Sequence, residues 1–256
     1  MIKRLNILNL WVDVVTMDQI LSLVTGYVEN GTRPHCIFAV NPEKNFSVPK
    51  DPELYKIFNS ADLLIPDGIG IVLAARILHG IRLSRVAGAD LMHAICELSA
   101  QKGYKVFVYG GQEYVNKGAV EQLSAIYPGL IITGRANGYV KQEIMEDLIQ
   151  KINSSGAQIL LLALGSPKQE KWFATYKHDL KGIRVCQGVG GTLDTVVGRV
   201  RRAPKAWQKI GMEWLYRLLS DPKRIKRQRV LPLFTALVLL SKVKSLASEP
   251  SHQGGL

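Results

Sequence analysis

Short apolar runs alternate with amphipathic stretches from residue 35 to residue 198. The runs are rich in β-branched and aromatic residues, whereas the stretches between them repeat apolar residues at helical spacing. The run at 158–164 has almost no polar residue, which is typical of a central parallel strand that is buried on both faces. The alternation predicts an α/β fold with a Rossmann-like, doubly wound, mainly parallel sheet. Strands are expected at 35–40, 63–65, 105–109, 130–133, 158–164 and 184–187.

Helix start signals fall between these expected strands. Thr16 and Gln19 fit a capping box before a helix that runs to about Asn30, and Asp51-Pro52 is a typical start for the next one. Further helices are expected at 70–78, 88–100 and 141–153, after the glycines at 110–111, and after Gly165.

Beyond residue 198 the alternation stops and the charge changes. Residues 199–256 hold 13 Lys and Arg against 3 Asp and Glu, whereas the first 198 residues hold 20 against 18. We therefore expect two parts, a Rossmann-like core at 1–198 and a basic, helical C-terminal appendage at 199–256. Cutting the chain after Arg199 is expected to preserve the fold of the core.

The appendage combines basic residues with an apolar run from Val230 to Leu240. This combination favours contact with an anionic membrane surface, because charge attraction and apolar burial both contribute. The alternative is a helix that packs on the core and presents a polar outer face. The run has eleven residues, too few for the roughly 20 that span a bilayer.

Several classes of site and location are disfavoured by composition. The three cysteines are odd in number and widely spaced, which indicates buried thiols in a reducing compartment. Charged residues near Met1 are not followed by the apolar segment of a signal peptide. The histidines show no paired spacing and no Asp-x-Asp is present, so neither a metal nor a cofactor is expected.

Two expected strands end abruptly in polar residues. Asn41-Pro42 follows the strand at 35–40, and Asp67 follows the strand at 63–65, between Pro66 and Gly68. Ligands of open α/β sheets bind at the carboxyl ends of the strands. Asn41 and Asp67 are therefore candidate site residues, although an ordinary turn or helix cap would use the same residue types.

Other strand ends carry weaker signals. Glycines after the strand at 105–109 and at 188–191 suit a phosphate-binding loop, but tight turns also use glycine. Gln169 and Glu170 could bind substrate hydroxyls or simply favour the helix dipole. In the basic segment, three arginines have the spacing of one side of a helical segment: Arg217, Arg224 and Arg227.

Together these residues resemble the WecG/TagA/CpsF glycosyltransferases. The resemblance extends from about residue 6 to residue 229 and rests on ordered motifs. They are Asn41-Pro42-Glu43, Pro66-Asp67-Gly68-Ile69-Gly70, Arg85 to Leu91, Gly110-Gly111, Leu164 to Glu170, Gly188 to Asp194, Arg201 to Pro204 and Glu213 to Leu219.

The resemblance implies an inverting, metal-independent transfer of N-acetylmannosamine or its uronic acid. The donor would be a UDP-sugar, and the acceptor a GlcNAc carried on undecaprenyl diphosphate, for a cell-surface polysaccharide or teichoic acid. It implies Asp67 as general base with Asn41 beside it, and arginines at 217, 224 and 227 that neutralise the diphosphate. The motifs supply the remaining predicted substrate-binding residues: Arg85, Gly110, Gly111, Gly165, Gln169, Glu170, Thr192 and Asp194.

The same resemblance places the protein in the cytoplasm, peripheral on the inner face of a bacterial plasma membrane. Ala39 departs from the family, which often has Thr two residues before the Asn, and this leaves the transferred sugar open. The alternative function is a non-catalytic RNA- or lipid-binding module. Beyond Trp207, Trp214 and Tyr216, which suit helix packing better, the basic segment lacks aromatic residues interleaved with arginine at stacking positions, so no nucleic-acid partner is expected. A homo-oligomer stays open.

Overall fold

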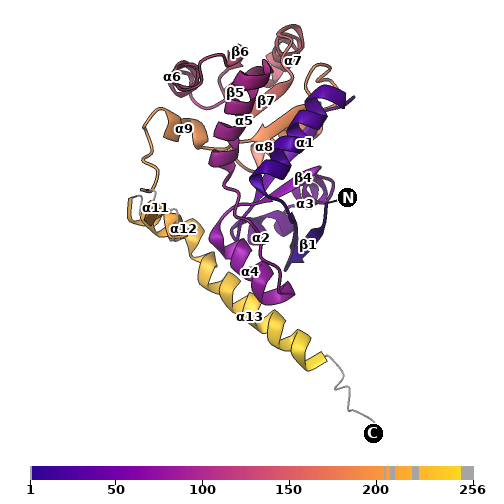
Figure 1. Ribbon diagram of the computed structural model, residues 1–256, viewed down its shortest axis with the longest axis vertical. Helices are drawn as coiled ribbons and strands as arrows, with labels where there is room; N and C mark the ends of the chain where they lie inside the picture. The colour runs from indigo at the N-terminus through magenta and orange to yellow at the C-terminus, as the bar shows by residue number, and fades with distance from the viewer. Residues whose placement is uncertain (1, 205, 208–210, 221–224, 249–256) are drawn as a thin grey trace.

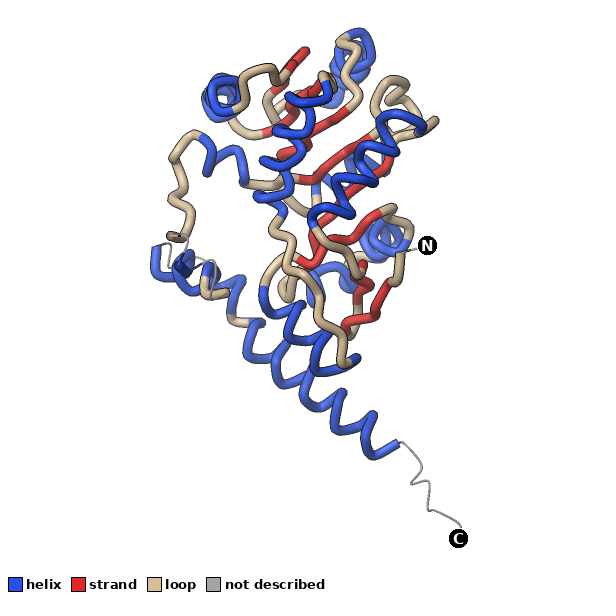
Figure 2. Tube along the Cα trace, in the orientation of Figure 1, coloured by secondary structure: helices blue, strands red, loops and turns tan. Residues whose placement is uncertain are grey.

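A six-stranded parallel sheet forms the centre of the computed structural model, which describes residues 2–204, 206–207, 211–220 and 225–248 (Figures 1 and 2). Its strands lie in the order β4-β3-β8-β7-β5-β6, and each paired neighbour runs parallel. The strands are β3 (His35–Val40), β4 (Leu63–Pro66), β5 (Lys105–Gly110), β6 (Ile131–Ala136), β7 (Ile159–Ala163) and β8 (Val185–Gly188).

Helices cover both faces of the sheet, so the predicted α/β, doubly wound architecture is confirmed. One face packs against α1 (Met17–Asn30), α5 (Gly88–Lys102), α6 (Glu113–Ile126) and α9 (Thr192–Val196). The other packs against α3 (Pro52–Asn59), α4 (Ile69–His79), α7 (Met145–Ser154) and α8 (Lys168–Tyr176). In β7, Leu160 and Leu162 face one layer and Leu161 faces the other, and all three are fully buried. Burial on both faces explains why this strand has no polar alternation.

The two predicted helix caps at Thr16 and Asp51 are both formed. The Thr16 hydroxyl accepts from the Gln19 backbone N–H, and the Gln19 side chain accepts from the Thr16 N–H. Asp51 likewise accepts from the N–H of Leu54 at the start of α3. Each cap satisfies a backbone donor that the first helical turn would otherwise leave unpaired.

An N-terminal hairpin was not predicted from the sequence. β1 (Arg4–Ile7) and β2 (Leu10–Asp13) form a separate antiparallel sheet. Its strands have only four residues each, which is too short for a clear alternating pattern. Tertiary contacts stabilise it: the Asp13 carboxylate accepts from the Arg4 guanidinium at 2.7 Å and from the Leu64 backbone N–H at 2.7 Å.

Two 3-10 turns lie next to helices of the core. A single helical turn, α2 (Lys44–Ser47), follows β3 and continues into a 3-10 turn at Val48–Lys50. The helix expected at 141–153 begins with a 3-10 turn, Gln142–Ile144, and α7 proper begins at Met145.

The C-terminal segment leaves the sheet at α9 and runs along one side of the molecule to α11 (Glu213–Ser220), α12 (Ile225–Gln228) and α13 (Val230–Ser248) (Figure 1). The sequence also predicts a helix start at Asp221-Pro222, and these two residues lie outside the described ranges. α13 lies along α4, and Phe234 and Val238 are buried in the same apolar cluster as Ile71. The apolar run of the appendage is therefore helical, and one of its faces packs on the core.

Among the described residues, none of the helices combines the length and the apolar character required to cross a membrane.

Candidate active site at the carboxyl edge of the sheet

Asn41 and Asp67 lie side by side where β3 and β4 end. The strands pair Val40 with Pro66, and the Asp67 N–H continues the ladder by donating to the Val40 carbonyl oxygen at 2.9 Å. Both residues are half-buried. Strands β3 and β8 are neighbours whose following helices pack on opposite faces, α3 on one and α9 on the other. Such a divergence is where open α/β sheets bind ligands.

The side chain of Asn41 has a defined orientation. Its Oδ1 accepts a hydrogen bond of 3.0 Å from the backbone N–H of Lys44. The acceptor end of the amide is thereby used within the turn, so the side-chain NH2 group is the end available to a ligand. Asn41 can therefore act as a hydrogen-bond donor to a ligand, and its neutral amide is too weakly basic to act as a base.

Arg85 lies beside the same strand end and contacts the C-terminal segment. The neighbouring N–H of Val86 donates to the Pro66 carbonyl at 3.0 Å, which fixes this stretch against the end of β4. The Arg85 guanidinium donates to the Glu213 carboxylate of α11 at 2.7 Å. The predicted substrate-binding residue is thus bound to a carboxylate of the C-terminal segment in this structure.

Two further contacts place the C-terminal segment at this edge. The Arg202 guanidinium lies 2.5 Å from an Asp90 carboxylate oxygen at the start of α5, and 3.9 Å from a Glu213 carboxylate oxygen. Gly211 lies so close to Ile69 that an added Cβ would come within 2.8 Å of that side chain. The core and the C-terminal segment therefore enclose the strand ends jointly.

Backbone conformation and close packing explain why positions 110 and 111 are glycines. Gly110 has φ 122°, and an added Cβ would lie 2.4 Å from the backbone of Ala163 on β7. The N–H of Gly111 donates to the Ala163 carbonyl at 3.0 Å, so this amide is already engaged. Close approach of β5 to β7 thus accounts for Gly110, whereas a positive φ of 73° favours glycine at position 111. Contact of either residue with a phosphate stays a prediction.

Gln169 and Glu170, in the first turn of α8, are buried and contact residues of neighbouring loops. Gly165, which has φ 76°, precedes α8. The Gln169 carbonyl Oε1 accepts from the N–H of Gly190 at 3.1 Å, and the Glu170 carboxylate accepts from the Lys44 ammonium at 2.9 Å. Glu170 is fully buried. The Glu170 carboxylate is thus engaged by Lys44 in this structure, and contact of Gln169 or Glu170 with substrate hydroxyls stays a prediction.

Thr192 and Asp194 follow β8. The Thr192 hydroxyl donates to the Val189 carbonyl at 2.6 Å and is buried, so it stabilises the turn that leads into α9. The Asp194 carboxylate accepts from Arg199 at 3.0 Å, and the same guanidinium contacts the Gln112 side chain at 3.3 Å. Both residues therefore organise the start of the C-terminal segment, and their contact with substrate stays a prediction.

The three arginines proposed to meet the diphosphate fall in α11, in α12 and between them. Arg217 belongs to α11 and Arg227 to α12, whereas Arg224 lies outside the described residues. Their role stays a prediction.

Cys36 and Cys186 lie toward the amino ends of β3 and β8, away from the candidate site. Burial raises the pKa of the Cys36 thiol to about 12 and raises that of Cys186 well above its usual value. Both thiols are thus protonated at neutral pH and poor nucleophiles. Within the described ranges, no three His, Cys, Asp or Glu side chains gather as metal ligands would.

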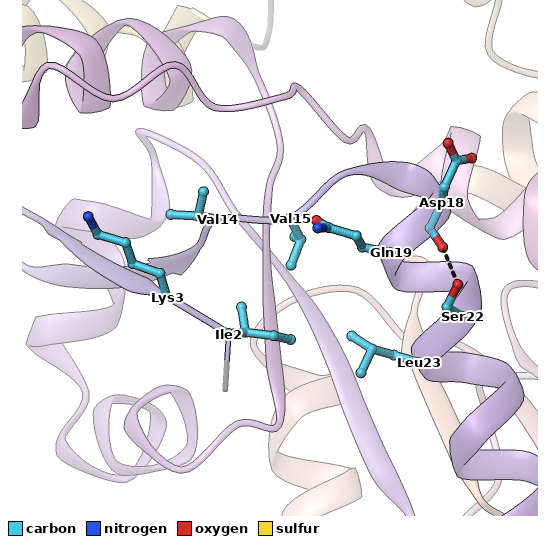
Figure 3. A pocket seen from close by; sticks show the side chains of 8 residues that line it. All are labelled: Ile2, Lys3, Val14, Val15, Asp18, Gln19, Ser22 and Leu23. Carbon is cyan, nitrogen blue, oxygen red and sulfur yellow. Dashed lines mark hydrogen bonds between the residues drawn. The ribbon is translucent and has the colours of Figure 1, made fainter.

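A surface groove of about 790 Å³ lies elsewhere, between the N-terminal hairpin and α1 (Figure 3). Apolar side chains such as Ile2, Val14 and Leu23 line it, together with Lys3 and the polar residues Asp18, Gln19 and Ser22. These residues flank the N-terminal hairpin or belong to α1, and none follows a strand of the parallel sheet, so we place the candidate active site at the strand edge.

Sequence reasoning missed the residues that connect these loops. Lys44, Arg199, Arg202 and Glu213 were not singled out individually, although the last two lie within the motifs that carry the family resemblance. Their partners lie far away in the sequence, so the contacts leave no local pattern.

Comparison with known proteins identifies the family of this chain. The sequence matches the model of the Glycosyl transferase WecG/TagA/CpsF family over residues 5–248. It is also 32% identical over 252 residues to an N-acetylglucosaminyldiphosphoundecaprenol N-acetyl-beta-D-mannosaminyltransferase of Bacillus spizizenii. The aligned region covers 98% of this chain and 95% of the relative. The chain therefore belongs to the WecG/TagA/CpsF family and is a glycosyltransferase.

Proposed function

We propose that this glycosyltransferase moves N-acetylmannosamine or its uronic acid from a UDP donor to GlcNAc on undecaprenyl diphosphate. The observation that carries the proposal is the pairing of Asn41 and Asp67 at a strand edge that Glu213 and Arg202 close from the C-terminal segment. The relative named above, by its name, acts on an acceptor of this type. Membership of a transferase family disfavours the alternative of a non-catalytic binding module.

Asp67 takes the proton of the attacking acceptor hydroxyl in the proposed mechanism. The hydroxyl oxygen forms a bond to the anomeric carbon while the bond from that carbon to the UDP oxygen breaks. A single displacement from the opposite face inverts the anomeric carbon, and one carboxylate is sufficient as base. Asn41 contributes its side-chain N–H donors to the sugar or the phosphate, since its oxygen is held by Lys44.

The departing UDP carries the negative charge that must be stabilised. Arginines at 217, 224 and 227 are the proposed source of positive charge, because guanidinium groups bind phosphate oxygens in a bidentate manner. The chain has no Asp-x-Asp motif that would bridge a metal to the diphosphate. We therefore propose a transfer that proceeds without a metal ion.

The lipid part of the acceptor is proposed to approach through α13 and its neighbours. Leu233 and Leu240 of α13 are exposed on the side away from Phe234, so the helix is apolar on both faces. Exposed apolar side chains beside a basic segment are typical of a membrane-contacting surface. A shallow groove of about 420 Å³ continues this surface between α11 and α13, and its lining includes Trp214, Leu218, Ile225, Leu231 and Pro232.

This surface supports a peripheral position on an anionic membrane, at the cytoplasmic face where the proposed lipid acceptor is used. The outer face of α13 is apolar, contrary to the polar outer face that a purely core-packing helix would present.

The test is an assay of the full-length protein with UDP-N-acetylmannosamine and with its uronic acid, against a short-chain polyprenyl-diphosphate-linked GlcNAc. We expect one donor to yield a disaccharide with inverted anomeric configuration, in EDTA as well as in Mg²⁺. Failure with both donors, by a protein that binds UDP in a thermal-shift assay, would contradict the proposed sugar. Activity that disappears in EDTA and returns with Mg²⁺ would contradict the metal-free mechanism.

A further inference from the structure

A buried ion pair connects two loops at the carboxyl edge of the sheet. The Lys44 ammonium lies 2.9 Å from Glu170 Oε1, with the lysine side chain 11% exposed and the glutamate fully buried. The Lys44 ammonium also lies 4.9 Å from the centre of the Phe58 ring. Lys44 begins α2 directly after the Asn41 turn, and Glu170 lies in the first turn of α8.

Stability alone does not explain such a pair. Removing two charges from water carries a desolvation penalty that their attraction often fails to offset, and apolar replacements are frequently as stable. Here the second carboxylate oxygen of Glu170 is buried and has no hydrogen-bond partner in the part of the chain that the structure describes. The pair therefore calls for a role other than packing.

The pair lies at the centre of contacts that reach three strand ends. On the β3 side, the backbone N–H of Lys44 holds Asn41 Oδ1 at 3.0 Å. On the β7 side, Gln169 precedes Glu170, and its side-chain N–H lies 3.4 Å from the same carboxylate oxygen. On the β8 side, Gln169 Oε1 accepts from the Gly190 N–H.

Packing leaves little freedom in this arrangement. A Cβ added to Gly188 would lie 2.6 Å from the Gln169 side-chain nitrogen, so the Gln169 amide rests directly on the end of β8. A displacement of Glu170 would therefore move Gln169, and with it the loop at 188–192, while a displacement of Lys44 would move the turn that orients Asn41.

We propose that Lys44 and Glu170 are positioning residues that fix Asn41 and the loop at 188–192 relative to each other for catalysis. The inference rests on the proposed function in one respect, namely that this strand edge is where the sugar is transferred. Neither side chain is proposed to touch the substrate. A misplacement of catalytic groups by about 1 Å can reduce turnover by about a hundredfold, so the expected effect is on kcat more than on KM.

The decisive variant replaces both charges with apolar side chains of similar size. Lys44→Met and Glu170→Gln each leave one buried group without its partner and are expected to lower both thermal stability and kcat. The double variant Lys44→Met/Glu170→Leu removes both charges and is expected to regain stability. If the pair positions the site, kcat of the double variant stays roughly tenfold or more below that of the wild type. Recovery of both stability and kcat would overturn the proposal.

The chain offers a matched control in the N-terminal hairpin. The Arg4–Asp13 ion pair is also partly buried, with its atoms 2.7 Å apart and the Asp13 side chain 2% exposed, and it contacts the backbone of Ala61 and Asp62 before β4. That is the end of the sheet opposite to the candidate site. Arg4→Met is expected to lower thermal stability while kcat of the folded protein stays unchanged. Equal losses of kcat in Arg4→Met and the double variant would indicate a general effect of stability.

Hydrogen exchange provides a readout that does not require a substrate. In the double variant, amides of the peptides covering 41–47 and 188–192 are expected to exchange faster, including the Gly190 N–H that Gln169 binds. Unchanged exchange in both peptides would overturn the inference even if the wild type proves active. If the wild type transfers no sugar but these two peptides lose protection, the proposed function fails and the structural coupling holds.

Discussion

The Asp67 N–H donates to the carbonyl oxygen of Val40 over 2.9 Å, which aligns Asp67 with Asn41 at the ends of two adjacent strands. The bond extends the parallel ladder one step beyond the pair Val40–Pro66. Two polar residues that are separated in the chain by α2, a 3-10 turn, α3 and β4 are thereby brought to one edge. Since a neutral amide is too weakly basic to take a proton at neutral pH, the carboxylate of Asp67 is the only base of the two, and Asn41 offers its N–H donors.

Replacing Asp67 with Asn tests this assignment. We expect transfer to fall by about 10²–10⁴-fold, because the isosteric amide cannot take the proton of the acceptor hydroxyl. UDP binding, followed by calorimetry, should change little, since the proposed base does not hold the diphosphate. Asp147→Asn, on the exposed surface of α7, serves as the control and should have normal activity. Normal turnover by Asp67→Asn would remove Asp67 as the base.

Phe234 tests whether α13 is part of the folded core. Its side chain is 3% exposed in the cluster that holds Ile71 and Ala75 of α4. We expect Phe234→Ala to lower the free energy of unfolding by about 3 kcal/mol, as for other buried aromatic truncations. Leu233→Ala, on the exposed side of the same helix, should change it by less than about 0.5 kcal/mol. Denaturant unfolding of both variants gives the comparison, and equal midpoints would argue against a packed α13.

This packing revises an expectation drawn from the sequence. Cutting the chain after Arg199 removes Phe234 and Val238 and exposes Ile71, so the shortened protein is expected to be less stable rather than equally well folded. Point substitutions in the full-length chain are for this reason the better probes of the C-terminal segment.

The predictable features are those encoded within a few residues of one another. The strand at 35–40 was predicted at its observed bounds, and the Thr16 capping box and the Asp51 cap form as expected. The pairing of Asn41 with Asp67 followed from adjacent strands that end in polar residues. Local sequence is informative here because periodicity and caps depend on neighbours in the chain.

The contacts that close the site could not be predicted in this way. Lys44 and Glu170 are 126 positions apart, and Arg85 and Glu213 are 128 apart. Nothing in the surrounding residues indicates either partner. The glycines at 110 and 111 illustrate the opposite limitation, because a residue pattern typical of phosphate binding also fits the close approach of β5 to β7 at Gly110 and the positive φ of Gly111.

The exposed side of α13 leads to a prediction about membranes. Leu233 and Leu240 are half exposed and would be buried in a lipid surface. Replacing both with Ser should weaken binding to vesicles that contain anionic lipid by about tenfold or more, because each buried Leu contributes about 1.5–3 kcal/mol when fully transferred. Sedimentation with vesicles measures the effect, and unfolding midpoints should stay close to that of the wild type.

A matched control for this experiment is Ile126→Ser at the end of α6, where an exposed Ile lies away from the C-terminal helices. Vesicle binding should be unaffected by that change. The wild type should also bind more weakly at high salt, because salt screens the attraction between basic residues and anionic lipid. Equal binding by the double Ser variant and the wild type would exclude α13 as the contact surface.

Asp62 gives a prediction for the dependence of stability on pH. Its carboxylate accepts from Arg33 at 2.5 Å and from the Cys36 N–H at 2.9 Å, where β3 begins. Burial alone would raise the pKa of Asp62, but these hydrogen bonds outweigh it and lower the pKa below its ordinary value. A carboxyl with a lowered pKa stabilises the folded state above its unfolded pKa of about 3.9, and this contribution is lost as pH falls through the folded pKa.

We therefore expect Asp62→Asn to reduce the free energy of unfolding by on the order of 1 kcal/mol at pH 7 and by much less at about pH 3. Urea unfolding at both pH values, with Asp147→Asn as the reference, measures the difference, and a loss of equal size at the two pH values would show that the charge of Asp62 does not stabilise the fold.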